Sequence, residues 1–159
     1  MLPADVAEFI QGGVSITVAS RDERLVPSIA KGVGCRVAEG GAELTVMIFA
    51  NAAEAVARDI ARHAQAAVVF CKPSTNRTVQ LKGRDVAIVP TGPADMALVR
   101  RWMALFAGDL QLLGWGLPYV EATFWHDPSQ LMALRFTPEG AFLQTPGPGA
   151  GAPLALRKP

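Results

Sequence analysis

The sequence predicts a mainly β protein: a closed or nearly closed antiparallel β-barrel with peripheral helices. Strand-like segments with alternating apolar residues dominate the chain. Three of them come first, one helical segment follows, and then come two more long strands. This order differs from the strand–helix alternation of a doubly wound parallel sheet. The length of 159 residues suits one domain with a sizeable core.

Seven segments read as strands. Residues 14–20 alternate, with Ile16 and Val18 on one side. The second segment contains Gly32 and Gly34, and glycine inside a strand indicates a bulge or the close approach of another group. The expected strands are 14–20, 26–37, 43–50, 66–71, 78–89 with a break near Gly83, 131–136 and 141–144.

The expected helices lie between these strands. Residues 3–11 form a short one that ends at Gly12-Gly13, and residues 52–63 form a second, with Asn51 as the N-cap. A third covers residues 93–106, whose apolar side chains recur at helical spacing. Residues 107–129 are aromatic-rich and are expected to be a loop with a short helix. We expect a single domain over 1–145, and a Pro/Gly-rich tail over 146–159 without regular structure.

Composition narrows the classes of function. The net charge is +1 and 18% of the residues are charged, which gives no reason to expect nucleic acid or an anionic membrane as a partner. No apolar run is long enough to span a bilayer, and the first residues lack the basic segment of a signal peptide. Cys35 and Cys71 are far apart and outside any Cys-x-x-Cys motif. These features predict a soluble cytoplasmic protein with reduced thiols.

Most familiar motifs are missing from the sequence. His63 and His126 are the only histidines and have no ligand spacing, so we expect no metal site. There is no Gly-x-Ser-x-Gly and no Walker A loop, and Gly32-Val33-Gly34 lacks the third glycine of a Rossmann fingerprint.

One strand has an unusual polar face. In the segment PSTNRTVQLKG, Thr78, Gln80 and Lys82 point one way. Arg77, Val79 and Leu81 point the other way. Such a face is either exposed to water or packed against something polar. Both alternatives are open from the residues alone.

The order of segments resembles the pyridoxamine 5′-phosphate oxidase-like, FMN-binding split-barrel family. The resemblance covers about residues 13 to 90, and Thr78-Val79-Gln80-Leu81-Lys82-Gly83 is its most specific part. It implies a six-stranded antiparallel split barrel, a homodimer, and FMN bound across the dimer interface. The strand from Thr78 to Lys82 would then line the flavin cleft, and the backbone of residues 28–32 would approach the flavin ring.

The sequence departs from the family's phosphate clamp. The family's basic positions in the second strand fall on Ala30 and Cys35, and its Arg-Lys pair after the third strand falls on Ala55 and Val56. Another pair, Lys31 and Arg36, keeps the same separation but is displaced by one residue, and a bulge at the glycines would restore its side-chain direction. Arg77 and the amides of the helix that follows Asn51 are further candidates to hold a phosphate. The expected cofactor contacts are Ser28, Ile29, Ala30, Lys31, Arg36, Asn51, Arg77, Thr78, Gln80 and Lys82.

The first functional hypothesis is therefore an FMN-dependent oxidoreductase that acts on a small molecule other than pyridoxamine phosphate, with no catalytic residue assigned. The second is a non-enzymatic dimeric module of the same fold that holds haem, a deazaflavin or no cofactor. A haem carrier would need an axial ligand such as His63 or His126. The third is a dimerisation domain in which the aromatic segment 115–125 caps a partner.

Overall fold

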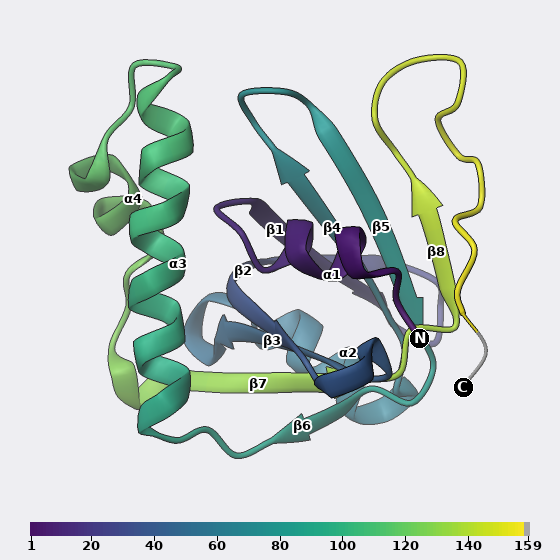
Figure 1. The fold of residues 1–159 in the computed structure, drawn as a ribbon. Coiled ribbons are helices and arrows are strands. Elements are labelled where there is room, and N and C mark those ends of the chain that lie inside the picture. Colours follow the sequence, from purple (N-terminus) through teal and green to yellow (C-terminus); the bar gives the residue numbers. More distant parts are fainter. Residues whose placement is uncertain (158–159) are drawn as a thin grey trace.

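The structure is a computed structural model that describes residues 1–157, and its strands form a single antiparallel sheet (Figure 1). The strand order is β6-β7-β3-β2-β1-β4-β5-β8. In Figure 1, β4, β5 and β8 stand steeply while β7 and β6 run across the bottom, so the sheet is strongly coiled. The end strands β6 and β8 do not pair with each other within residues 1–157, so the barrel is open along one side. The strands are β1 (Ser15–Arg21), β2 (Pro27–Val37), β3 (Leu44–Phe49), β4 (Ala66–Lys72), β5 (Arg77–Gly83), β6 (Ala87–Val89), β7 (Leu131–Phe136) and β8 (Gly140–Leu143).

The mainly β antiparallel fold with helices on the outside is confirmed, but the expected count of six strands is not, since there are eight. The segment predicted as one interrupted strand over 78–89 is two strands at different places. β5 pairs with β4 and β8, whereas β6 pairs with β7 near the opposite edge. The chain crosses at Gly83, where an added Cβ would lie 2.4 Å from Cδ2 of Phe136, so only glycine fits this approach.

Four α-helices cover the sheet: α1 (Ala4–Ile10), α2 (Glu54–His63), α3 (Pro93–Gln111) and α4 (Leu117–Phe124). Three short 3₁₀ turns, η1 (Glu39–Gly41), η2 (Ala50–Ala52) and η3 (Pro128–Gln130), complete the elements. Residues 107–129, expected to be a loop with a short helix, contain a short helix, α4, and in addition the end of α3. The N-cap of α2 is Ala53 rather than Asn51, because residues 50–52 first form a 3₁₀ turn.

The bulge predicted for β2 is present. Gly32 pairs with Ile48 of β3, but the next pair joins Cys35 to Val46, so β2 has one extra residue at this point. Within the bulge Gly34 has a φ of +141°, and an added Cβ would lie 2.5 Å from Cδ2 of Leu98 on α3. The bulge therefore bends β2 and lets α3 approach its backbone.

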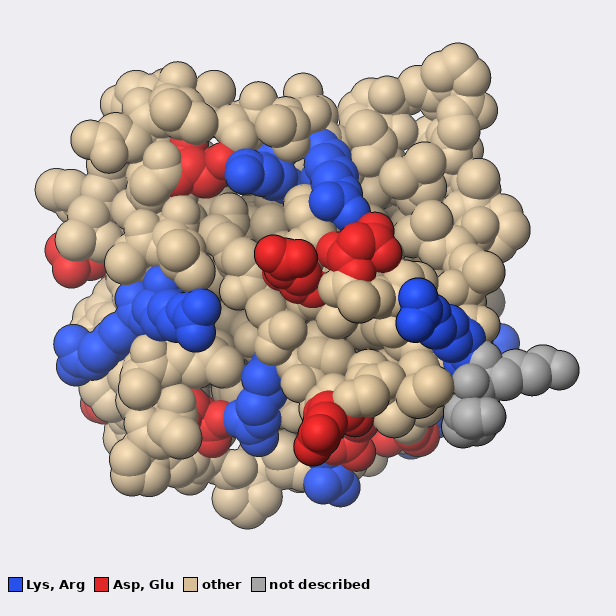
Figure 2. Space-filling view, in the orientation of Figure 1, with Lys and Arg blue, Asp and Glu red and all other residues tan. Residues whose placement is uncertain are grey.

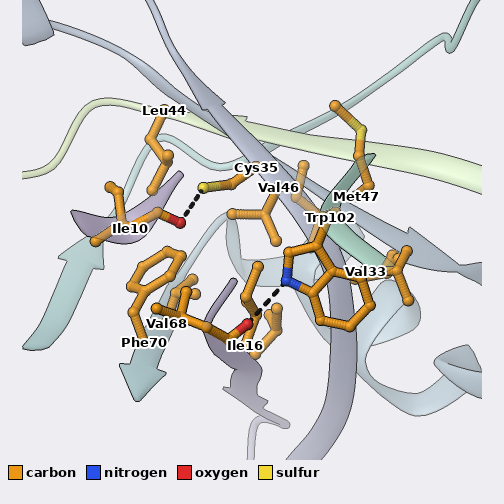
Figure 3. Packing of buried hydrophobic residues seen from close by; sticks show 14 of the residues in the cluster. Ile10, Ile16, Val33, Cys35, Leu44, Val46, Met47, Val68, Phe70 and Trp102 are labelled. Atoms are coloured by element: carbon orange, nitrogen blue, oxygen red, sulfur yellow. Dashed lines mark hydrogen bonds between the residues drawn. The ribbon is translucent and has the colours of Figure 1, made fainter. Parts of the chain in front are cut away.

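Two hydrogen bonds attach the helices to the bent strand and its neighbour (Figure 3). Nε1 of Trp102 in α3 donates to the carbonyl of Val14 at 2.8 Å. Sγ of Cys35 donates to the carbonyl of Ile10, at the end of α1, at 2.9 Å. Burial raises the pKa of the Cys35 thiol far above its usual range, so this sulfur is a neutral hydrogen-bond donor in the core.

The chain after Thr145 runs back along the edge of β8. The amide of Leu143 donates to the carbonyl of Ala152 at 2.9 Å, and the amide of Leu154 donates to the carbonyl of Ala141 at 2.8 Å. Only an isolated β-bridge between Phe142 and Pro153 is formed, as expected for a Pro/Gly-rich segment. The last two residues of the predicted tail, 158 and 159, lie outside the described residues. The division into a domain over 1–145 and a tail stays a prediction.

No helix within residues 1–157 is both long enough and apolar enough to cross a lipid bilayer.

Replacing Gly34 with alanine is expected to lower the free energy of unfolding by about 1–3 kcal/mol, because an alanine at this positive φ is strained. Chemical denaturation measures the change. The control is Gly108→Ala in the middle of α3, where an added Cβ has nothing within 4 Å and alanine should stabilise the helix by up to about 1 kcal/mol. Equal stability of Gly34→Ala and the wild type would show that the bend in β2 does not require glycine.

Candidate functional site

The outer face of the sheet brings predicted residues of β2 and β5 into one cross-strand row. Lys31 pairs with Thr17 of β1, Thr17 with Val69 of β4, Val69 with Gln80 of β5, and Gln80 with Phe142 of β8. These residues alternate with the buried ones and therefore point away from the core. Lys31 and Gln80 are three strands apart, which is about 14 Å at the usual spacing.

The adjacent row carries two more predicted residues. Ile29 pairs with Ala19, Ala19 with Ala67, and Ala67 with Lys82. The side chain of Ile29 is 67% exposed although it is large and apolar. This outer face thus combines two lysines, a glutamine and an exposed isoleucine on a mostly small-residue background. It is therefore partly polar and partly apolar.

Two further predicted residues of β2, Ser28 and Ala30, point inward, as strand alternation requires. Ala30 is buried in the core. The hydroxyl of Ser28 donates to Oδ2 of Asp59 on α2 at 2.7 Å. That hydrogen bond, helped by the neighbouring Arg58, holds the pKa of Asp59 below its usual range despite the opposing effect of burial. The side chains of Ser28 and Ala30 therefore cannot contact a ligand on the outer face.

The polar face of β5 mostly contacts polar groups of its own chain. The hydroxyl of Thr78 donates to the carbonyl of Asn76 at 2.9 Å. Oε1 of Gln80 accepts from Nε2 of Gln144 at 3.5 Å, a long contact. Nζ of Lys82 lies 4.9 Å from the ring centre of Phe142. Of the two alternatives for this face, the structure shows a partly covered surface: Thr78 is buried and Lys82 is exposed.

The three cations proposed for a phosphate do not converge. Arg77 lies on the inner face, with its guanidinium 4.2 Å above the ring of Phe9. Arg36 forms an ion pair with Asp95, which also caps α3 by accepting the Gly92 amide at 2.9 Å. Lys31 and Arg36 are five residues apart along β2, or about 16 Å at the usual rise per residue. Only Lys31 remains available on the outer face near β3.

Lys31 opens onto a small corner pocket of about 90 Å³ between β2, the end of β3 and the end of α4. The nearest polar group is Oγ1 of Thr17, at 3.4 Å from Nζ of Lys31, and Lys31 has no ion pair within residues 1–157. The pocket is lined by Lys31, Val33, Phe49, Ala52, Thr123, Phe124 and His126.

His126 lines this pocket, although the sequence suggested it only as a possible haem ligand and not as a neighbour of Lys31. Its Nδ1 lies 3.4 Å from Nδ2 of Asn51, and its ring centre lies 5.2 Å from that of Phe49. The contact joins residues 75 positions apart, and a single histidine after a short helix carries no local signal of it. Asn51, predicted at this corner, does lie here, but its side chain is turned to His126 and does not cap α2.

Two backbone features adjoin this corner. β2 pairs with β3 only from Gly32 onwards, so residues 27–31 have no strand neighbour on that side. The N-terminus of α2, preceded by Ala52 of the pocket, has no side-chain cap. Unpaired amides at such a place can hydrogen-bond an anion, although Glu54 in the first turn opposes this.

No group of three or more histidine, cysteine, aspartate or glutamate residues is placed to hold a metal ion within residues 1–157.

No protein-family model and no curated protein sequence matches this chain. Several solved structures have the same fold. HupZ of Group A Streptococcus matches 95% of this chain and 100% of its own with a TM-score of 0.56 at 13% identity. The match to an F420 reductase covers 88% of this chain and 98% of the reductase, with a TM-score of 0.58 at 14% identity. The match to a pyridoxamine 5′-phosphate oxidase-related, FMN binding protein of Nostoc punctiforme covers 94% of this chain and 87% of that protein, with a TM-score of 0.51 at 14% identity.

These similarities confirm the suspected fold family: the chain has the fold of pyridoxamine 5′-phosphate oxidase-like FMN-binding proteins. At 13–14% identity they define the fold and do not carry the neighbours' activities to this chain.

Replacing Ser28 with alanine is expected to raise the pKa of Asp59 towards its usual value, because the hydroxyl hydrogen bond is the main cause of the lowering. A lowered folded-state pKa stabilises the protein above the unfolded value of about 4, and this stabilisation is lost as the pH falls through the folded value. The stability difference between wild type and Ser28→Ala should thus be largest near neutral pH and narrow below pH of about 4. Denaturation at several pH values measures it; a difference that stays constant with pH would contradict this role.

Proposed function

We propose that this chain is a flavin-binding split-barrel protein that binds FMN and acts as an oxidoreductase on a small molecule. The observation that carries the proposal is the unpaired Lys31 at the corner pocket, beside the open edge of β2, in a fold shared with an FMN-binding protein. A bound flavin would supply the electron or hydride transfer, and the protein would supply binding and orientation.

The residues of the corner fit a phosphate better than a whole flavin. Lys31 provides an unpaired ammonium group, and His126 and the open amides near Ala52 could add hydrogen bonds. Ligand sites are typically about 300–1,000 Å³, whereas this pocket holds about 90 Å³. The flavin ring would therefore extend from the corner onto the outer face, towards Ile29 and Gln80.

A ring on that face would be exposed in a single chain. A second copy packed on the outer face would enclose it and would also cover Ile29, which is 67% exposed. We therefore propose a homodimer with the cofactor at the interface. Lys82 and Gln80 would lie on the far side of the same surface and would contact the partner copy or the polar edge of the flavin.

A second candidate function is a non-enzymatic dimeric module of the same fold. It is favoured by the dispersal of the proposed cations, since Arg36 is held by Asp95 and Arg77 lies on the other face. Such a module could hold haem, a deazaflavin or nothing. His126, half-buried at the corner, is the histidine that a haem would reach there.

The visible absorption spectrum of the purified protein, recorded after FMN is added and removed by gel filtration, tests the proposed cofactor. We expect a retained flavin spectrum. Lys31→Ala should weaken FMN binding by about 1.5–3 kcal/mol, the range for hydrogen bonds to charged groups. Arg135→Gln is the control and should bind as the wild type does, because Arg135 pairs with Glu43 near the end of β7 that is remote from the corner. A colourless protein would remove the oxidoreductase proposal and leave the binding module.

Introducing a charge at Ile29 tests the proposed dimer face. Ile29→Glu is expected to shift the protein from dimer to monomer in analytical ultracentrifugation, because it buries a carboxylate in the interface. The matched control is Trp115→Glu, which alters another exposed large apolar residue, 53% exposed in the turn before α4. A monomer from Trp115→Glu and a dimer from Ile29→Glu would instead support the dimerisation domain in which segment 115–125 contacts the partner.

A further inference from the structure

A larger cavity, of about 720 Å³, lies away from the outer face, between α1, α3 and the hairpin of β4 and β5. Figure 2 shows a hollow in this region with basic and acidic groups around it. Its volume is within the range of small-molecule sites. It is lined by Asp5, Glu8, Phe9, Gln11, Gly12, Gly13, Val14, Cys35, Lys72, Arg77, Leu98, Arg101, Trp102 and Leu105.

Two cations face each other at the rim. Lys72 and Arg77 are direct partners across the β4–β5 pair and both point inward. Like charges at directly opposite positions destabilise a strand pair unless something offsets their repulsion. The structure offsets it only loosely: Nζ of Lys72 lies 3.7 Å from Asp109, and Nη2 of Arg77 lies 3.5 Å from Asp5.

These distances leave hydrogen-bonding capacity unused. Charge-assisted hydrogen bonds are usually about 2.7–2.9 Å long, so both ion pairs are longer than usual. A guanidinium has five donors, and Arg77 directs few of them to protein acceptors. Arg101 on α3 also lines the cavity and forms no ion pair within the described chain.

The charged residues that line the cavity indicate which class of ligand it can bind. Three cations and two carboxylates line the cavity, and Asp109 beside Lys72 brings the local charges into balance. Lys72 and Arg77 each have a carboxylate neighbour, so Arg101 is the lining cation without one among residues 1–157. The floor of the cavity is apolar, with Val14, Leu98, Trp102 and Leu105. We infer that this cavity binds a small organic monocarboxylate with an apolar body. The inference does not depend on the flavin site.

The ligand carboxylate would lie between Arg77 and Arg101, where it completes the pairing that Asp5 provides only in part. The apolar body would lie over Leu105, which is 43% exposed. Beneath it the buried Trp102 is held by its hydrogen bond to Val14 and by stacking on Phe106 at 5.0 Å. Glu8 of α1 also lines the cavity and has no ion pair within residues 1–157, so it disfavours a second negative charge on the ligand.

Isothermal titration calorimetry with 4-phenylbutyrate as the probe tests the site. The comparison compounds are the neutral amide of 4-phenylbutyrate and phenyl phosphate. We expect 4-phenylbutyrate to bind with one site per chain, and both comparison compounds to bind about tenfold more weakly or not at all.

Variants assign the binding to this cavity. Arg77→Gln and Arg101→Gln should each weaken 4-phenylbutyrate binding about tenfold. Glu8→Gln should strengthen it, a direction that general destabilisation of the fold cannot produce. Arg100→Gln, the neighbour of Arg101 that instead lies 5.0 Å from the ring of Trp125, should leave it unchanged.

Three outcomes overturn the inference. They are the absence of saturable binding at millimolar probe, equal binding of acid and amide, and stronger binding of phenyl phosphate. A loss of affinity in Arg100→Gln as large as that in Arg101→Gln would also overturn it, because the effect would then not depend on the cavity.

Discussion

The bend of β2 at Gly32 to Cys35 is the constraint on which the rest of the structure depends. The extra residue lets Gly34 adopt a positive φ, and the missing side chain admits Leu98 of α3. Once α3 is against the strand, its indole at Trp102 reaches the carbonyl of Val14. The pairing of β2 with β3 continues past the bend to Gly32–Ile48 and stops where β3 ends at Phe49, so residues 27–31 are left with an open edge. The larger cavity under α3 thus follows from the bend, and the corner follows from the end of β3.

Strand alternation then divides the chemistry between the two faces. On β5, Arg77 points to the cavity under α3, whereas Gln80 and Lys82 point to the outer face. On β2, Ser28 points inward to Asp59 and Lys31 points outward. A set of residues that is contiguous in sequence therefore serves two separate surfaces. This is why the contacts expected from the family resemblance are only partly brought together.

The sequence was a good guide where local rules decide the outcome. The strand 131–136 agrees with β7, and the glycines in the second segment indicated the bulge. Local rules failed where tertiary contacts decide. The length of α3 beyond residue 106 comes from burying Leu110 against the core, and the separation of β5 from β6 comes from their pairing with distant strands. The approach of His126 to Asn51 and Lys31 has no local signal, because it depends on where α4 ends in space.

The distribution of carboxylates supports a functional reading of the outer face. Buried charges are costly unless paired, and the buried Asp59, Asp95 and Asp109 each accept hydrogen bonds that join a helix to another element. Cations of β2, β4 and β5 that face helices have carboxylate partners: Arg36, Lys72 and Arg77. The two on the outer face, Lys31 and Lys82, have none within residues 1–157. The fold thus neutralises the cations it uses for its own packing, and the unneutralised pair lies on the surface where a cofactor phosphate and a second copy of the chain are proposed to bind.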